Sequence, residues 1–132
     1  MQKSFIAQNS ETFPENFRRE FDAHVYYTAD TRAKAVQLRE EAVREFHGRP
    51  VFVGHLIDRL VGPHPLPMFE IDFAKADLGE ILPWLMHHRA GLSVLVHEVT
   101  GDDPKDHTQG AAWLGERVEL DMSQLEPSPK KG

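Results

Sequence analysis

The sequence contains no cysteine, which excludes disulfide scaffolds, thiol catalysis, thiolate zinc sites and iron–sulfur clusters. It has no apolar run long enough to span a bilayer, and residues 1–16 are too polar for a secretory signal. Basic residues are also scarce, because 15 Lys and Arg stand against 21 Asp and Glu, for a formal net charge of −6. That balance argues against sequence-independent binding of nucleic acid or of an anionic membrane. We therefore expect a cytoplasmic protein whose partners are small molecules.

The composition is that of one folded domain. The chain has 132 residues, of which 40% are hydrophobic and 27% charged, enough for a core that needs no metal or disulfide. Residues 1–18 are polar and interrupted by Pro14, so they are expected to form a flexible arm. Residues 126–132 hold two prolines and two lysines and are expected to form a disordered tail. A single domain is therefore predicted over residues 19–125.

The hydrophobic periodicity changes several times along this domain. Alternating or continuous apolar patterns predict strands, and apolar residues at helical spacing predict helices. Strands are expected at 21–28, 50–58, 68–73 and 92–99, and helices at 31–47, after an Asp30 N-cap, and at 76–89. Residues 101–107 are expected to be a charged loop, and 111–125 to hold a further extended element. The order β-α-β-β-α-β predicts an α+β, ferredoxin-like fold, an antiparallel sheet with both helices on one face.

The other face of such a sheet has to be covered by a partner chain, a ligand or the terminal segments. A homodimer formed through this face is the simplest solution, and we expect one. The same face carries the most informative side chains, because eight histidines are present and two of them alternate with apolar residues in predicted strands. His24, Glu70 and His97 are predicted to share this face on neighbouring strands, about 5 Å apart per strand.

Two imidazoles and a carboxylate on one face match the facial triad that holds non-haem Fe(II) and leaves positions open for substrate and oxygen. The same ligands also suit zinc or another divalent metal. His64, in the turn before the third strand, offers a third nitrogen or an acid–base group. His107 lies in a charged loop and is either part of the site or solvated. The plainer alternative is that these histidines are hydrogen-bonded structural residues.

Seven short motifs occur in order along residues 21–125: AHVY at 23–26, VGPHP at 61–65, PWLM at 83–86, LSVLVH at 92–97, TGDD at 100–103, DHT at 106–108 and WLG at 113–115. Together they resemble the DOPA 4,5-dioxygenase family of small ring-opening dioxygenases. The resemblance implies a ferredoxin-like fold, a usual dimer and extradiol cleavage of a catechol ring with O₂.

The resemblance also implies roles for individual residues. His24, His64 and His97 are the positions that carry over as metal ligands, with Glu70 as the alternative to His64. Whichever of His64 and His107 is not a ligand would serve as the catalytic acid–base. Substrate contacts are expected from a further set of residues: Arg59, as the anchor of a carboxylate, Tyr26 and His55. Alternatively, Arg59 forms an ion pair with Asp58 or Glu70 and does not bind substrate.

The sequence departs from the family pattern at two positions. Asp22 and Ile57 stand where many members have histidine, and His55 lies one strand period from Ile57. These departures support an alternative function, a non-catalytic ferredoxin-like dimer that binds a small aromatic ligand or a metal.

Overall fold

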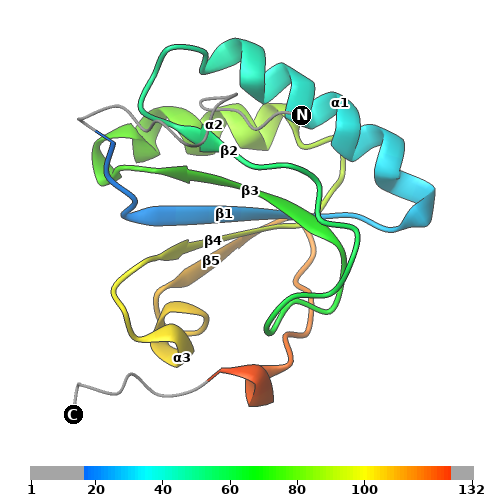
Figure 1. Cartoon of the computed structure of the whole chain (residues 1–132), viewed down its shortest axis with the longest axis vertical. Coiled ribbons are helices and arrows are strands. Elements are labelled where there is room, and N and C mark those ends of the chain that lie inside the picture. The colour runs from blue at the N-terminus through cyan, green and yellow to red at the C-terminus, as the bar shows by residue number, and fades with distance from the viewer. Residues whose placement is uncertain (1–16, 126–132) are drawn as a thin grey trace.

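The computed structural model describes residues 17–125, so most of the predicted arm (1–16) and the predicted tail (126–132) lie outside the described residues. The chain forms an antiparallel sheet of order β2-β3-β1-β4-β5. The strands are β1 (Phe21–Tyr26), β2 (Phe52–Val53), β3 (Met68–Phe73), β4 (Val94–Glu98) and β5 (Ala111–Leu114). Helices α1 (Arg32–Glu45) and α2 (Leu78–His88) cover one face, as Figure 1 shows. The predicted α+β class, with both long helices on one face, is confirmed.

Alternation along the strands builds the core between sheet and helices. In β1, Ala23 and Val25 have no exposed surface, and they pair with Ile71 and Phe69 of β3 and with Val96 and Val94 of β4. These side chains pack in one cluster with residues of α1 and α2, among them Leu38, Ala42, Ile81 and Leu85. Burying each large aliphatic side chain contributes roughly 1.5–3 kcal/mol. The alternate residues of each strand are thereby directed to the opposite face.

Two predicted elements are wrong in extent or kind. The second strand is two residues long rather than nine, since the chain leaves β2 after Val53 and forms a long loop to β3. Three prolines in residues 61–67 cannot donate to a strand ladder, which limits pairing in this loop. The predicted charged loop contains helix α3 (Asp103–Asp106), which the Asp102 side chain caps by accepting a hydrogen bond from the Lys105 N–H.

The start of α1 also differs from the prediction. Asp30 lies inside a 3-10 turn (Ala29–Thr31), and Thr31 occupies the N-cap position of α1. The Thr31 hydroxyl accepts a hydrogen bond from the Thr28 N–H at 2.8 Å, which closes the turn before the helix. Two further 3-10 turns precede α2 (Lys75–Asp77) and follow β5 (Met122–Gln124).

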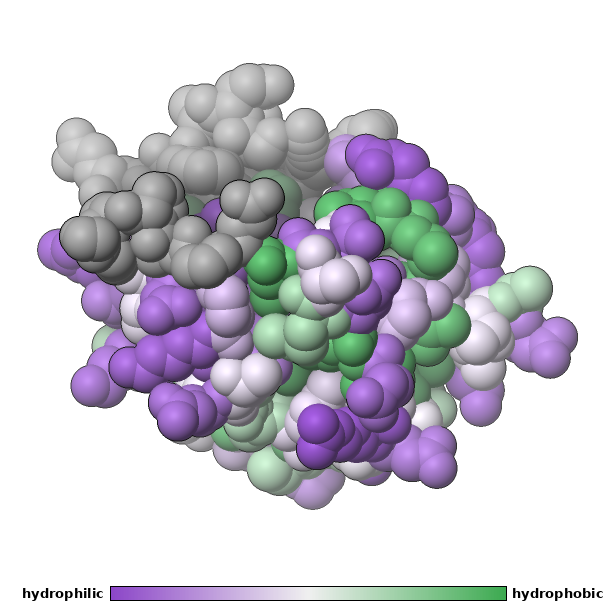
Figure 2. All heavy atoms as spheres, turned by 90° about the horizontal axis from the view of Figure 1, so that it is seen from below, coloured by the Kyte–Doolittle hydropathy of each residue, from purple (hydrophilic) through white to green (hydrophobic). Residues whose placement is uncertain are grey.

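The face opposite the helices is covered in part by the chain itself. Tyr26, Met68 and Leu95 are buried there beneath partly buried apolar residues of the β2–β3 loop and of the segment after β5: Ile57, Val61, Leu66, Val118 and Leu120. The two covering segments are joined by a hydrogen bond from the Asp121 N–H to the Pro63 carbonyl at 2.8 Å. Figure 2 views this side and shows apolar surface surrounded by hydrophilic side chains. These two segments therefore cover part of the face on which a partner chain was predicted, and the homodimer stays a prediction.

Among the helices described between residues 17 and 125, none has the length and apolar character needed to cross a bilayer.

Candidate metal centre

A cavity of about 480 Å³ lies on the face opposite the helices, among β1, β3, β4, the β2–β3 loop and α3. Four of the eight histidines line it: His24, His64, His97 and His107. Its volume falls within the range of small-molecule sites in proteins, roughly 300–1,000 Å³. The strand residues reach the cavity because they alternate with the core residues, as the sequence predicted for His24, Glu70 and His97.

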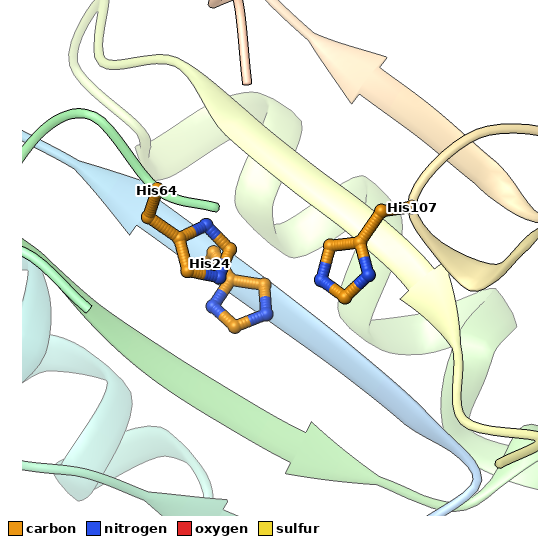
Figure 3. Close-up of side chains that lie close together, drawn as sticks. All are labelled: His24, His64 and His107. Atoms are coloured by element: carbon orange, nitrogen blue, oxygen red, sulfur yellow. The ribbon is translucent and has the colours of Figure 1, made fainter. Parts of the chain in front are cut away.

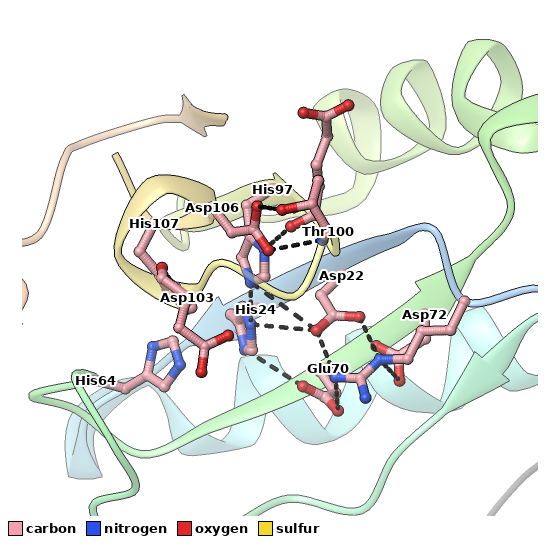
Figure 4. Close-up of polar contacts among 12 residues, drawn as sticks. Asp22, His24, His64, Glu70, Asp72, His97, Thr100, Asp103, Asp106 and His107 are labelled. Carbon is pink, nitrogen blue, oxygen red and sulfur yellow. Dashed lines mark hydrogen bonds and ion pairs between the residues drawn. The ribbon is translucent and has the colours of Figure 1, made fainter. Parts of the chain in front are cut away.

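His24 and His97 point their Nε2 atoms at each other. They lie on the adjacent strands β1 and β4, in a register that places His97 directly opposite Asp22 and diagonal to His24. Their Nε2 atoms are 3.0 Å apart, and each residue is only 4% exposed. The two side chains therefore converge on one point inside the cavity (Figure 4).

In two of the histidines, a backbone carbonyl determines which ring nitrogen carries the hydrogen and which is bare, that is, has a free lone pair. His97 Nδ1 lies 2.6 Å from the Glu98 carbonyl, and His107 Nδ1 lies 2.8 Å from the Asp103 carbonyl. A carbonyl oxygen can only accept, so each Nδ1 is the donor and each Nε2 carries a free lone pair. This arrangement, with Nδ1–H held by a carbonyl, is typical of histidines that bind metals.

The remaining two imidazoles come from loops and complete the cluster. His64 follows Gly62, whose φ of +58° allows the tight turn, and the His64 ring centroid lies 4.2 Å from that of His24. His107 ends α3, and its ring centroid lies 4.2 Å from that of His97. Figure 3 shows His24, His64 and His107 turned toward one another. Ligand atoms of these three residues lie within 4.8 Å of each other.

The environment keeps three of these rings neutral. Burial, together with the neighbouring histidines, lowers the pKa of His24 well below its usual value and lowers that of His64 to about 4. Burial also lowers the pKa of His97. Desolvation penalises the imidazolium, so the neutral form, which alone can bind a metal, is favoured.

Two carboxylates approach the histidine pair from different sides. The Asp22 Oδ2 atom lies 4.0 Å from His24 Nε2 and 3.9 Å from His97 Nε2, on the side where these nitrogens converge. The Glu70 Oε1 atom instead lies 3.5 Å from His24 Nδ1, at the other edge of the ring. Asp22, His24 and His97 therefore offer two nitrogens and one oxygen within 4.8 Å of one another.

Arg19 holds the acidic side of the cavity. Its Nε and NH2 groups donate to the two oxygens of Asp22 at 2.9 and 2.6 Å, and its guanidinium lies 3.9 Å from Glu70 and 3.5 Å from Asp72. Burial and the Asp22 charge raise the pKa of Glu70 to about 7. Burial and the Glu70 charge raise the pKa of Asp72 well above its usual value. The Arg19 guanidinium thus forms ion pairs with all three carboxyl groups.

The structure separates the predicted site residues into two groups. His24, His64, Glu70, His97 and His107 all line the one cavity. The predicted substrate contacts do not: Tyr26 is buried beneath His64, while Arg59 and His55 are exposed and lie outside the cavity lining.

Sequence reasoning missed Asp22 and Arg19 as site residues. For Asp22 a signal existed, because it lies one strand period before His24 and so shares its face. Arg19 precedes β1 and had no periodic pattern to reveal its position.

Comparisons with known proteins point to one family of dioxygenases. The model of the Dopa 4,5-dioxygenase family matches residues 21–124. The chain is 34% identical over 125 residues to an uncharacterised 21.2 kDa protein of Botryotinia fuckeliana, covering 86% of this chain and 67% of that protein. It is 28% identical over 115 residues to the DOPA 4,5-dioxygenase of Amanita muscaria, covering 81% of this chain and only 50% of that protein.

A solved structure is similar as well. The crystal structure of a "putative dioxygenase" from Nostoc punctiforme superimposes with a TM-score of 0.75 and 37% identity, over 81% of this chain and 90% of that one.

Proposed function

The chain belongs to the Dopa 4,5-dioxygenase family, and from this premise we propose that it is a non-haem Fe(II) extradiol dioxygenase that opens the ring of a catechol with O₂. The substrate would be DOPA-like or another dihydroxyphenyl compound. The observation that carries the proposal is the convergence of His24 and His97, with Nε2 atoms 3.0 Å apart in a cavity of about 480 Å³.

The donor atoms suit a divalent ion. The two Nε2 atoms lie 3.0 Å apart, close enough for one ion to bind both. We assign the ion to His24 and His97, with Asp22 as the third ligand, because two imidazoles and a carboxylate suit Fe(II) and leave positions free. When bound, the ion would supply Lewis acidity and bring the substrate and O₂ together.

The chain's own residues orient these ligands and the substrate. The Glu98 carbonyl fixes the His97 ring, Glu70 faces the Nδ1 atom of His24, and Arg19 holds both oxygens of Asp22. Apolar residues also line the cavity and would contact the ring of a catechol: Val61, Met68, Val99 and Leu125. The bare Nε2 atom of His107 is a suitable acceptor for a catechol proton, because the Asp103 carbonyl keeps its other nitrogen protonated.

The test is oxygen uptake by protein loaded anaerobically with Fe(II), with L-DOPA, caffeic acid and catechol as substrates. We expect stoichiometric uptake and a yellow ring-opened product with at least one of them. His24→Ala should abolish both iron binding and uptake. His88→Ala is the matched control, since His88 stacks on Trp84 outside the cavity and should change neither. Iron binding without uptake for any catechol would instead favour the non-catalytic, ligand-binding alternative.

A further inference from the structure

The hydrogen bond between Tyr26 and His64 differs in kind from those that the Nδ1 atoms of His97 and His107 make with backbone carbonyls. The Tyr26 hydroxyl lies 2.7 Å from His64 Nδ1, and Tyr26 is only 2% exposed. Among residues 17–125, the Tyr26 hydroxyl forms its hydrogen bond with His64 Nδ1. A buried hydroxyl left without an acceptor costs about 1–3 kcal/mol. The hydroxyl is the donor of this bond, because a neutral phenol has one hydrogen to donate and His64 Nδ1 is the acceptor within its reach.

The direction of this bond determines the tautomer of His64. Because Tyr26 O–H donates, His64 Nδ1 accepts and has to be bare. A neutral imidazole carries one N–H, which for His64 is then on Nε2. His97 and His107 are the reverse, since their Nδ1 atoms donate to carbonyls and their Nε2 atoms are bare. The tautomer of His64 is thus the opposite of that of His97 and His107.

We propose that His64 donates a hydrogen bond from Nε2 to an oxygen of the substrate and is not a metal ligand, and that Tyr26 is the positioning residue that imposes this tautomer. The identity of that oxygen as a catechol oxygen rests on the proposed function. A nitrogen that carries hydrogen has no lone pair for an ion, whereas it is suited to an oxygen that becomes anionic on binding.

The His64 ring is held in place for this role. The turn that carries it is closed by a hydrogen bond from the His64 N–H to the Val61 carbonyl at 3.1 Å. The Asp121 N–H fixes the same turn through the Pro63 carbonyl, and Tyr26 is itself stacked on Trp113 with ring centroids 5.9 Å apart. The donor is therefore presented from one rigid position at the edge of the cavity, 5% exposed.

Metal content separates a ligand from a hydrogen-bond donor. His64→Gln keeps an N–H donor near the position of Nε2, and we expect it to bind Fe(II) or Zn²⁺ with wild-type stoichiometry. His24→Ala should lose the ion under the same conditions. Loss of the ion from His64→Gln to the same extent as from His24→Ala would overturn the proposal. His64→Leu repeats the test with a side chain that has no ligand atom, and it should bind the ion as His64→Gln does.

Nitrogen NMR of the imidazoles tests the role of Tyr26. In ¹⁵N-labelled protein loaded with Zn²⁺, we expect His64 Nδ1 to show a pyridine-type shift and Nε2 a pyrrole-type shift. Tyr26→Phe should remove this preference and mix the two tautomers. Tyr27→Phe is the control, because it deletes a neighbouring hydroxyl that donates to Asp58 at 2.5 Å, and should leave the His64 signals unchanged. A bare Nε2 in the wild type, or no change in Tyr26→Phe, would refute the assignment.

Turnover gives a third measurement. We expect His64→Leu to lower kcat/KM for a catechol roughly 10- to 100-fold, as loss of one hydrogen bond to a charged oxygen does, and His64→Gln to restore part of it. Equal kcat/KM for His64→Leu and wild type would contradict the donor role. The metal and NMR measurements need no turnover, so absence of catechol cleavage would refute the proposed function alone, and a wrong tautomer would refute this inference alone.

Discussion

Replacing Glu70 by glutamine should change the pH dependence of the stability of the metal-free protein. The Glu70 side chain is 23% exposed, and burial beside Asp22 raises its pKa from the usual 4.5 to about 7. The folded state therefore binds this proton more tightly than the unfolded state. The resulting stability is fully present below pH 4.5 and is lost as the pH rises through about 7.

The magnitude follows from the size of the shift. A change of one pKa unit corresponds to about 1.4 kcal/mol, so the shift gives about 3 kcal/mol, which partial solvation reduces to about 2–3 kcal/mol. Glutamine carries no charge at any pH. The free energy of unfolding of Glu70→Gln, relative to wild type, should therefore rise by about 2–3 kcal/mol between pH 4.5 and pH 8.

Urea denaturation followed by circular dichroism, with a chelator present, measures this difference at each pH. Glu80→Gln is a suitable control, because Glu80 is exposed, pairs with Arg49 and has a lowered pKa, so its difference should change in the opposite direction. A Glu70→Gln difference that stays constant with pH would refute the raised pKa assigned to Glu70.

Three further predictions concern the ion and the helix beside it. His97→Ala should weaken Zn²⁺ or Fe(II) binding at least 100-fold in equilibrium dialysis, because one of the two converging nitrogens is lost; unchanged affinity would rule out His97 as a ligand. Because the pKa of His24 and that of His97 are lowered, protons should compete little with the ion as the pH falls from 8 to 6.5, and affinity should decline only at lower pH; a steep decline already at pH 7 would contradict this. Asp106→Ala should lower the free energy of unfolding by about 1–3 kcal/mol, since buried Asp106 accepts hydrogen bonds from the N–H and hydroxyl of Thr100; an unchanged melting temperature would show that these bonds contribute nothing.

Much of the fold was predictable because its signals are local. Strand alternation placed Ala23 and Val25 against the helices and sent His24 to the other face, and the same rule placed His97. The two long helices followed from apolar spacing. Errors occurred where a distant contact or the local turn decides the outcome: the second strand ended early, α3 formed from a charged segment, and Thr31 rather than Asp30 occupies the N-cap position of α1.

The sequence by itself determined the α+β class, the shared face of His24, Glu70 and His97, and the family, because strand periodicity and ordered motifs can be read without knowing what packs on them. Only the tertiary structure decided the surroundings of those residues. Arg19 forms an ion pair with Asp22. The Tyr26 hydroxyl forms a hydrogen bond with His64, which is 38 positions away in the chain. Two segments of the chain cover part of the face where a partner was expected, and Arg59 lies outside the cavity lining. These outcomes depend on how loops pack against the sheet, and loop packing leaves no period in the sequence.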